Sequence, residues 1–401
     1  MPQRTVLLSV YLPTTFLALG QGLLLATLPL YADGLSVSYR LVSFAVAAAA
    51  LGTLITDVPA GALLGHLGLR RAMIGGTALV AGSTLALAFS SSLKQVVVLR
   101  LVAGIGTALW GLSRHAYIAE SIPSAERGRA ISVFGGINRV GVFGGPAIGG
   151  IIGERFGLHA SFLVAGAAGA IALLSSVLFL TPARSTTVAS PVAARWRLVR
   201  SLIRRNGRDL AAASVAQTFA QMIRAGRYFI IPIYGADILG LDAATVGLIM
   251  TLGAIVDVSM FFPAGLLMDR FGRKVAAVPS FAVMAIGVAI IPLTHHQFGL
   301  MAASVVIGFG NGLGSGTMMT LGADLAPPGA TGEFLGVWRL VGDVGAVSGP
   351  LVVGAMATAL GLRASAVALA AVGMVATLTL AFLVQETRAS SLGIGPEAHA
   401  D

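Results

Sequence analysis

Long apolar runs constrain this chain more than any other feature of its 401 residues. They repeatedly reach the ~20 residues that a helix needs to cross a bilayer. Only 10% of the residues are charged, against about 25% in a typical soluble domain. Strands of a transmembrane barrel would show ~10-residue segments of alternating polarity, and these runs do not alternate. The sequence therefore predicts an all-α polytopic membrane protein whose surroundings are the lipid bilayer.

Charges, glycines and prolines divide the apolar sequence into twelve candidate spans. The seventh of them is interrupted by Arg224 and Arg227. We expect transmembrane helices at 6–31, 41–64, 72–91, 95–119, 130–153, 160–181, 210–234, 243–268, 275–294, 298–322, 334–358 and 364–384.

Basic residues between the spans predict the orientation of the chain. If the N-terminus is cytoplasmic, sixteen lysines and arginines fall in loops on that side and four on the other. Cytoplasmic loops of membrane proteins carry this excess, so we expect both termini in the cytoplasm. The net charge of +10 is then explained by the basic cytoplasmic loops, and we expect no nucleic-acid partner. Arginine outnumbers lysine 24 to 2, which favours a GC-rich bacterial genome and hence a bacterial inner membrane.

Residues for metal or cofactor chemistry are scarce in this sequence. It has no cysteine, which excludes disulfides, thiolate metal sites and cysteine nucleophiles. The six histidines are scattered, and neither an HExxH motif nor a G-x-x-x-x-G-K-[ST] phosphate-binding loop occurs. We expect no metal, no cofactor and no enzymatic activity.

The chain contains an internal repeat with an offset of 204 residues. This shift superposes Pro59-Ala60-Gly61 on Pro263-Ala264-Gly265, Glu120 on Asp324, and Gly145-Pro146 on Gly349-Pro350. We therefore expect two six-helix bundles related by a pseudo-twofold axis, at 1–181 and 210–384. A basic cytoplasmic linker at 182–209 joins them, either as a short helix on the anionic leaflet or as a solvated segment, and a cytoplasmic tail follows at 385–401.

The loop between spans 8 and 9 matches G-x-L-x-D-R-x-G-R-[RK] at every defined position, from Gly265 to Lys274. With the two six-helix halves, it resembles the major facilitator superfamily of transporters. The counterpart between spans 2 and 3 has Gly65, His66 and Leu69 where the pattern has an acid and two arginines. The residues of both motif regions are Gly61, Gly68, Arg70, Arg71, Glu120, Gly265, Asp269, Arg270, Gly272, Arg273 and Asp324.

Charges in these two motif regions suggest cytoplasmic latches. We expect Arg273 near Asp324, and Arg70 or Arg71 near Glu120, because each acid ends a span at a repeat-equivalent position. The alternative is that these charges stay solvated and only set the topology.

Three further patterns resemble the drug:proton antiporter branch of this superfamily. They are Leu19-Gly20 with Pro29-Leu30-Tyr31 in span 1, Arg100 with Gly104 and Gly106 in span 4, and a glycine-proline motif in span 5. Small residues at this spacing allow close helix packing. The span 5 motif comprises Gly141, Gly145, Pro146, Gly149 and Gly150.

Polar side chains form stripes on spans 1, 4, 7 and 10. Ionisable groups in a span are costly and mark partners or a watery cavity, and the resemblance implies that these four spans line a central cavity. The alternative is that the uncharged members only hydrogen-bond between packed helices. Our candidates for the cavity lining are Gln21, Thr107, Trp110, Arg114, Gln217, Gln221, Arg224, Tyr228 and Asn311.

A second set of charges falls in one layer near the predicted cytoplasmic side. The resemblance implies that span 2 faces span 11 and that span 5 faces span 8. We therefore expect Asp257–Arg139 and Asp57–Arg339 bridges between the halves, although Arg339 and Asp343 could equally pair within one helix as an i,i+4 pair. The candidates for this gate and for proton coupling are Asp57, Arg100, Arg139, Asp257, Arg339 and Asp343.

These observations predict a monomeric secondary transporter that works by alternating access. The activity that the motifs favour is proton-coupled efflux of a small amphipathic compound or drug. The first alternative is a carrier for an organic anion, because arginines give the predicted cavity a positive potential. A non-transporting membrane receptor or scaffold is less favoured, since no sizeable soluble domain is present.

Overall fold

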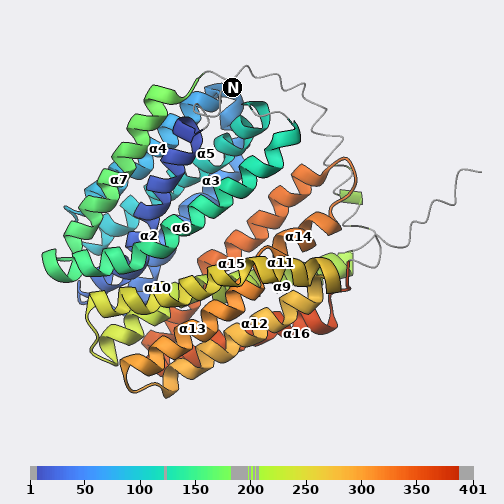
Figure 1. Cartoon of the computed structure of the whole chain (residues 1–401). Helices are drawn as coiled ribbons and strands as arrows, with labels where there is room; N and C mark the ends of the chain where they lie inside the picture. The colour runs from blue at the N-terminus through green and yellow to red at the C-terminus, as the bar shows by residue number, and fades with distance from the viewer. Residues whose placement is uncertain are drawn as a thin grey trace, which may run out of the picture.

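The computed structural model describes residues 7–121, 124–181 and 207–387, together with residues 197, 200, 201 and 204. Side chains are described in these ranges except at 58–66, 119–121, 124–135, 138 and 140. All regular elements in the described part of the chain are helices (Figure 1).

Twelve helical spans follow one another along the chain, close to the ranges that the apolar runs predict. The first six are η1 (Leu7–Tyr11) with α2 (Leu12–Asp33), α3 (Tyr39–Leu67), α4 (Leu69–Leu87), α5 (Leu93–Ser121), α6 (Ser124–Phe156) and α7 (Leu158–Phe179). The second six are α9 (Gly207–Asp237), α10 (Ala243–Ser259) with α11 (Phe261–Phe271), α12 (Arg273–Ile290) with η2 (Ile291–Leu293), α13 (Gln297–Leu313) with α14 (Thr317–Leu325), α15 (Thr331–Leu360) and α16 (Leu362–Phe382).

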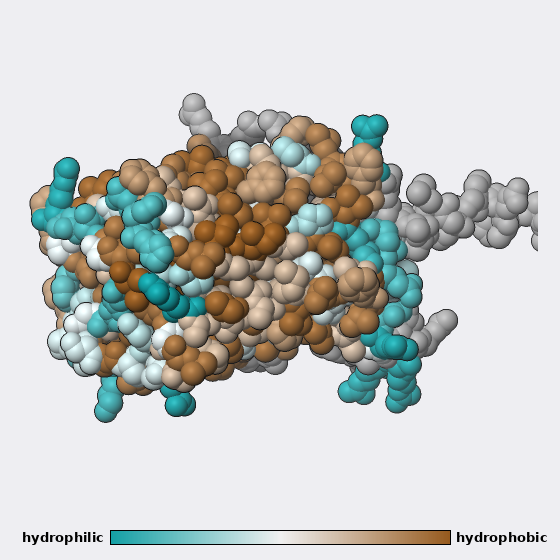
Figure 2. All heavy atoms as spheres, turned by 90° about the horizontal axis from the view of Figure 1, so that it is seen from below, coloured by the Kyte–Doolittle hydropathy of each residue, from teal (hydrophilic) through white to brown (hydrophobic). Residues whose placement is uncertain are grey.

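Apolar side chains cover the middle of the molecule, and polar ones gather at its two ends (Figure 2). Among the described residues, nine helical stretches have the length and hydropathy of a membrane span. Of the helices that fall short, α9 carries Arg224 and Arg227 in its middle. An exposed belt of apolar residues between two polar ends is the surface that a bilayer requires. This chain is a polytopic membrane protein.

The tenth span is interrupted where a glycine-rich segment separates α13 from α14. Gly316 adopts a left-handed conformation with φ of 80°, which a residue without Cβ reaches at little cost. The α13 helix therefore ends at Leu313, and the carbonyl of Gly314 accepts a hydrogen bond from Arg224 Nη2 at 2.9 Å. The break thus supplies an acceptor to an arginine at mid-membrane depth.

Helices α2 to α7 pack mainly on one another, and so do α9 to α16. Their closest contacts recur at the 204-residue offset of the sequence. A Cβ built on Gly145 would collide with the backbone of Gly22, and one on Gly349 would lie 3.0 Å from the backbone nitrogen of Gly226. Each pair joins the fifth span of its half to the first.

Two seams join these groups of helices, one between α3 and α15 and the other between α6 and α10. The seams are also equivalent at the same offset. A Cβ on Gly150 would collide with the carbonyl of Ala243, and one on Gly354 would lie 2.6 Å from the carbonyl oxygen of Tyr39. We call these the α6–α10 seam and the α3–α15 seam. Their tight contacts lie at the end of the bundle where α2 ends and α3 begins, which we call the far end.

Candidate substrate cavity and gate

A polar cavity lies between helices of both halves. It is lined by Arg139 from α6, by Arg224, Arg227 and Tyr228 from α9, and by Asn311, Ser315 and Gly316 at the break in the tenth span. It holds about 240 Å³. This is a little below the ~300–1,000 Å³ of typical small-molecule sites.

Asp257 of α10 organises one wall of this cavity. Its side chain is 2% exposed and lies 3.7 Å from Arg227 Nη2. Asn311 Nδ2 donates to the same carboxylate oxygen at 2.5 Å. Arg227 also donates to the Tyr228 hydroxyl at 2.8 Å. A buried carboxylate requires partners of this kind, so the charge of Asp257 is balanced from within the C-terminal half.

The other two arginines of the cavity contact aromatic faces. The Arg224 guanidinium carbon lies 5.0 Å from the centre of the Phe281 ring, and that of Arg139 lies 4.4 Å from the centre of the Phe261 ring. Cation–π contacts of this length are attractive. The bridge expected between Arg139 and Asp257 is not formed here, because Asp257 takes Arg227 and Asn311 as its partners instead.

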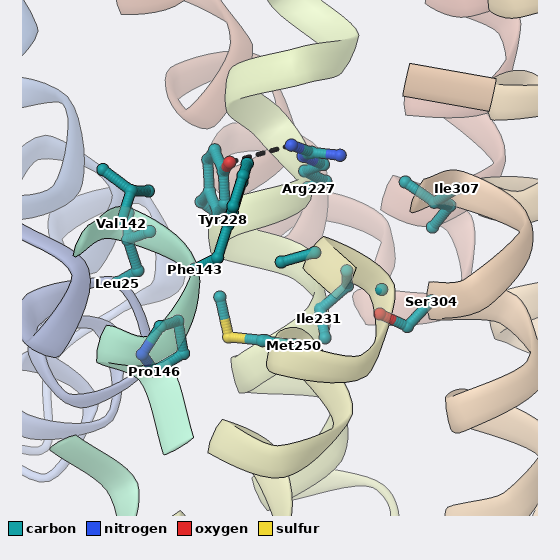
Figure 3. A pocket seen from close by; sticks show the side chains of 12 residues that line it. Leu25, Val142, Phe143, Pro146, Arg227, Tyr228, Ile231, Met250, Ser304 and Ile307 are labelled. Atoms are coloured by element: carbon teal, nitrogen blue, oxygen red, sulfur yellow. Dashed lines mark hydrogen bonds between the residues drawn. The ribbon is translucent and has the colours of Figure 1, made fainter. Parts of the chain in front are cut away.

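An apolar cavity adjoins the polar one. Leu25, Val142 and Phe143 line it from the N-terminal half, and Ile231 and Met250 line it from the C-terminal half (Figure 3). Arg227 and Tyr228 belong to the lining of both cavities, so the two spaces share a wall. The apolar space is small, about 30 Å³ in this structure, so it is an apolar recess beside the polar cavity.

Buried polar atoms without a hydrogen-bond partner concentrate around the polar cavity. Among the described residues, they include Arg224 Nε, Arg227 Nε, Asn311 Oδ1 and Ser315 Oγ. Buried polar atoms are almost always hydrogen-bonded, either to protein or to water. These atoms are therefore available to water or to a bound ligand.

The α3–α15 seam carries three charged side chains. Arg339 Nη2 lies 3.3 Å from Asp57 Oδ2, and this ion pair joins the two halves. The carboxyl groups of Asp57 and Asp343 interact electrostatically with each other. Two carboxylates have acceptors and no donor, so they can hydrogen-bond each other only when one of them holds a proton. The seam thus places one arginine beside two acids from different helices.

The α6–α10 seam has a different pair at the equivalent positions. An offset of 204 residues carries Asp57 to Phe261 and Arg139 to Asp343. One seam therefore places two acids across from each other, and the other places Arg139 over the ring of Phe261. The duplicated framework is the same, but its chemistry has diverged.

The far end is closed by polar contacts between the halves. Tyr39 donates to Asp237 Oδ2 at 2.7 Å, and the carboxyl groups of Asp33 and Asp237 interact electrostatically with each other. The amide of Arg40 donates to Thr358 Oγ1 at 2.8 Å. These contacts surround the tight glycine packing of the two seams.

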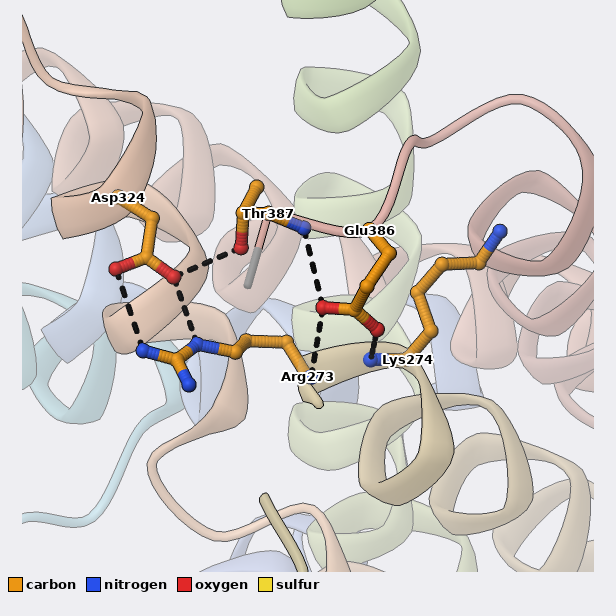
Figure 4. Close-up of polar contacts among 5 residues, drawn as sticks. All are labelled: Arg273, Lys274, Asp324, Glu386 and Thr387. Carbon is orange, nitrogen blue, oxygen red and sulfur yellow. Dashed lines mark hydrogen bonds and ion pairs between the residues drawn. The ribbon is translucent and has the colours of Figure 1, made fainter. Parts of the chain in front are cut away.

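The motif loop of the C-terminal half forms an ion-pair cluster (Figure 4). Arg273 Nε donates to Asp324 Oδ2 at 2.7 Å, and Thr387 Oγ1 donates to the same oxygen at 2.7 Å. Glu386 accepts from the backbone amides of Arg273 and Lys274, both at 2.9 Å. Glu386 therefore caps the start of α12 after the turn at Gly272, where φ is 106°. Asp269, the acid of the motif itself, is exposed.

In the N-terminal copy of this loop, Arg70 binds backbone carbonyls. Arg70 Nε donates to the carbonyl of Leu180 at 2.7 Å, and Nη2 donates to that of Val177 at 3.2 Å. Lys274 makes the equivalent contact with Ala381 at 2.8 Å. Both cations satisfy carbonyls at the end of the last helix in their half. The side chain of Glu120, expected as a partner of Arg70 or Arg71, lies outside the described residues.

The glycine-proline motif of α6 packs this helix between two others. Gly141, Gly145 and Gly149 face α2, where an added Cβ would collide with backbone or side-chain atoms. Gly150 faces Ala243 of α10 in the other half, and the carbonyl of Pro146 lies against Gly247. The motif therefore serves both the packing within one half and a seam between halves.

Several predicted lining residues lie elsewhere. Trp110 is 4% exposed and packs against Met73 and Tyr117 in the core of the N-terminal half. Gln217 and Gln221 pack against the glycines of α15. The remaining candidates for the lining, Gln21, Thr107 and Arg114, line neither of the two cavities described above. Arg100, a candidate for the gate, lines neither cavity and has a buried Nε without a hydrogen-bond partner.

Other functional contacts were not predicted from the sequence. The apolar wall of Leu25, Phe143 and Met250 has no pattern that separates it from lipid-facing residues. Glu386 stands one turn after the last span, and this position was the only available sign of its role. Asp237 is different, because the 204-residue offset pairs it with Asp33 and could have identified it.

Comparisons with known proteins agree with this architecture. The model of the Major Facilitator Superfamily matches residues 10–242 and again residues 213–399. This chain belongs to the Major Facilitator Superfamily. It is a secondary transporter, and its family and fold are those of a transporter rather than an enzyme.

Individual relatives of this transporter are distant. The synaptic vesicular amine transporter of Mus musculus is 26% identical over 77% of this chain, which spans 59% of that protein's length. The tetracycline resistance protein, class C, of Escherichia coli is 24% identical over 89% of this chain and 90% of its own. A crystal structure of a D-xylose-proton symporter superposes with a TM-score of 0.79 at 18% identity, covering 96% of this chain and 98% of the other.

Proposed function

We propose that this transporter exports a small amphipathic organic compound in exchange for protons, from the cytoplasm across a bacterial inner membrane. Its halves, 1–181 and 210–384, would rock about a pseudo-twofold axis around the cavity between α6, α9 and α13. Support comes from the contacts that recur at the 204-residue offset. Support for export is the resemblance of the α6 motif to antiporters and the tetracycline resistance relative.

Proton coupling in this proposal rests on the Asp57–Asp343 pair. With one shared proton, the two acids hold α3 and α15 together. When the proton leaves, two carboxylates face each other, and Arg339 can neutralise one of them. Repulsion then favours separation of the seam. Proton occupancy and the orientation of the halves are thereby linked, as exchange requires.

Cargo binding is the other half of the exchange cycle. The polar and apolar cavities lie among helices of both halves, so a bound molecule contacts surfaces that move relative to each other. A cargo that binds one orientation more tightly shifts the equilibrium toward it. Protons and cargo then act on the same pair of states from different places, the α3–α15 seam and the central cavity.

The test is proton movement in proteoliposomes that contain the purified chain and a pH-sensitive dye. A compound panel added to one side should discharge an imposed pH gradient, and Asp343→Asn should abolish this discharge while the protein still binds cargo. Asp209→Asn, at the start of α9 and away from the cavity, is the matched control and should behave as wild type. Full proton exchange by Asp343→Asn would refute this assignment of the coupling site.

A further inference from the structure

The polar cavity has more positive than negative groups. Three guanidinium groups, those of Arg139, Arg224 and Arg227, interact electrostatically with one another. Asp257 is the carboxylate that interacts with all three. Arg227 lies 3.7 Å from it, and these two charges balance each other. The remaining positive charge belongs to Arg139 and Arg224.

Neither of these two arginines has a carboxylate partner within ion-pair distance among the described residues. Their contacts are the ring of Phe261 for Arg139, and the ring of Phe281 and the carbonyl of Gly314 for Arg224. Such contacts reduce the cost of holding a cation in a membrane interior, but they do not supply a counter-charge. An anionic ligand would supply it.

Hydrogen-bonding capacity in the cavity also suits an anion. Arg224 Nε is a buried donor without a partner, and Ser315, which is 7% exposed, has a hydroxyl without one. A guanidinium offers donors and no acceptor, and it matches the two oxygens of a carboxylate. A cationic head group would find the unpartnered Oδ1 atoms of Asp257 and Asn311, but also three arginines that repel it.

The neighbouring space is apolar. Leu25, Phe143 and Met250 line it, and it meets the polar cavity at Arg227 and Tyr228. This recess holds about 30 Å³, so the apolar side chains border the polar cavity without enclosing a large space. A cargo whose head lies in the polar cavity therefore has apolar side chains beside it.

We infer that the cargo of this transporter is an amphipathic organic anion. Its oxyanion head lies between Arg139 and Arg224, near Ser315, and its apolar body lies against Leu25, Phe143 and Met250. This inference rests on the proposed function in that it takes the central cavity to be the cargo site. It sets the chain apart from a relative whose name denotes an amine transporter.

The test compares three compounds with one aromatic skeleton: 2-naphthylacetate, 2-naphthylacetamide and 2-naphthylethylamine. Binding to the purified full-length chain in nanodiscs is measured by calorimetry at constant ionic strength. The acid should bind at least about tenfold more tightly than the amide, as one or two charge-assisted hydrogen bonds imply, and the amine should bind most weakly. Tighter binding of the amine, or no binding of any of the three, would overturn the inference.

Substitutions of the two arginines test where the head group of the cargo binds. Arg224→Gln should weaken binding of the acid by about tenfold and leave the amide unchanged, and Arg224→Lys should restore part of the difference. Arg139→Gln should act in the same direction. Arg363→Gln, at an exposed arginine at the start of α16, is the matched control. Equal weakening of acid and amide by Arg224→Gln would contradict the assignment of the head site.

The proton measurement separates this inference from the proposed function. If the amine discharges a pH gradient and the acid does not, the cargo class is wrong and proton-coupled transport stands. If the acid binds with the expected arginine dependence but moves no protons, the cargo class stands and proton coupling is wrong.

Discussion

Asp33 and Asp237 hold equivalent positions at the ends of α2 and α9, and their carboxyl groups interact electrostatically across the two halves. A hydrogen bond between them needs a proton on one of the two carboxyls, since two carboxylates have no donor to share. Tyr39 donates a hydrogen bond from its hydroxyl to Asp237 at 2.7 Å. We therefore expect closure of the far end to depend on a proton held by this pair.

A rise in pH that removes the proton from this pair should loosen the far end. Both carboxyls are then charged and repel each other, while Tyr39, the other titratable side chain in contact with them, still donates its hydrogen bond. Spin labels at Phe156→Cys and Leu293→Cys would report the separation of the halves, and the chain has no cysteine of its own. The distance should increase from acid to alkaline pH. In Asp237→Asn the amide replaces the shared proton, so an unchanged pH response there would contradict this mechanism.

Arg339 and Asp57 should be energetically coupled across the α3–α15 seam. A double-mutant cycle with Arg339→Gln and Asp57→Asn should give a coupling free energy of about 1 kcal/mol in thermal unfolding, because the pair is partly exposed. Arg339 and Asp343 form the comparison cycle. If that cycle shows all of the coupling, Arg339 serves its own helix and not the seam.

Loss of the motif-loop cluster should destabilise the C-terminal half. Glu386→Ala removes the acceptor for two amides at the start of α12, and loss of such a cap costs about 1 kcal/mol. Arg273→Ala removes a two-point contact with Asp324. Arg363→Ala is the control. Hydrogen exchange of the first turn of α12 should increase in both cluster variants and stay unchanged in the control.

Two adjacent glycines of α6 allow a sharp packing test. Gly145→Ala places a methyl group into the backbone of Gly22, whereas nothing lies within 4 Å of a Cβ at Gly144. Overpacking of this kind typically costs about 1–3 kcal/mol. The melting temperature should therefore fall by several degrees in Gly145→Ala and hold or rise in Gly144→Ala. Equal melting temperatures would show that α2 and α6 can separate without cost.

The helical framework was predictable because lipid imposes it on the sequence. Every span must satisfy its backbone hydrogen bonds internally, so apolar runs and their breaks indicate helices directly. The breaks within spans are harder to predict. Gly314 and Gly316 end α13 early, but glycine is common in this chain, and its effect here depends on the contact with Arg224.

No described side chain of α5 lines either cavity, whereas the polar stripe on α9 includes residues that line the polar one. Arg224 and Tyr228 line it, whereas Trp110 is in a core. Helix periodicity predicts the direction of a side chain only to within one or two positions. The glycines of a neighbouring helix then determine which side chains pack against it, as Gln217 and Gln221 do against α15. The sequence could not predict which arginine pairs with Asp257, because Arg139 and Arg227 are both close enough to compete for it.

The unequal seams have a consequence for how motion is driven. The acid pair on α3 and α15 can gain or lose a proton, whereas an arginine stacked on a phenylalanine keeps the same charge throughout the biological pH range. In the proposed cycle, a change in proton occupancy would therefore act on the α3–α15 seam, and the α6–α10 seam would follow without a change of charge. Duplication supplied two matching seams, and divergence placed an acid pair in one of them and an arginine–aromatic contact in the other.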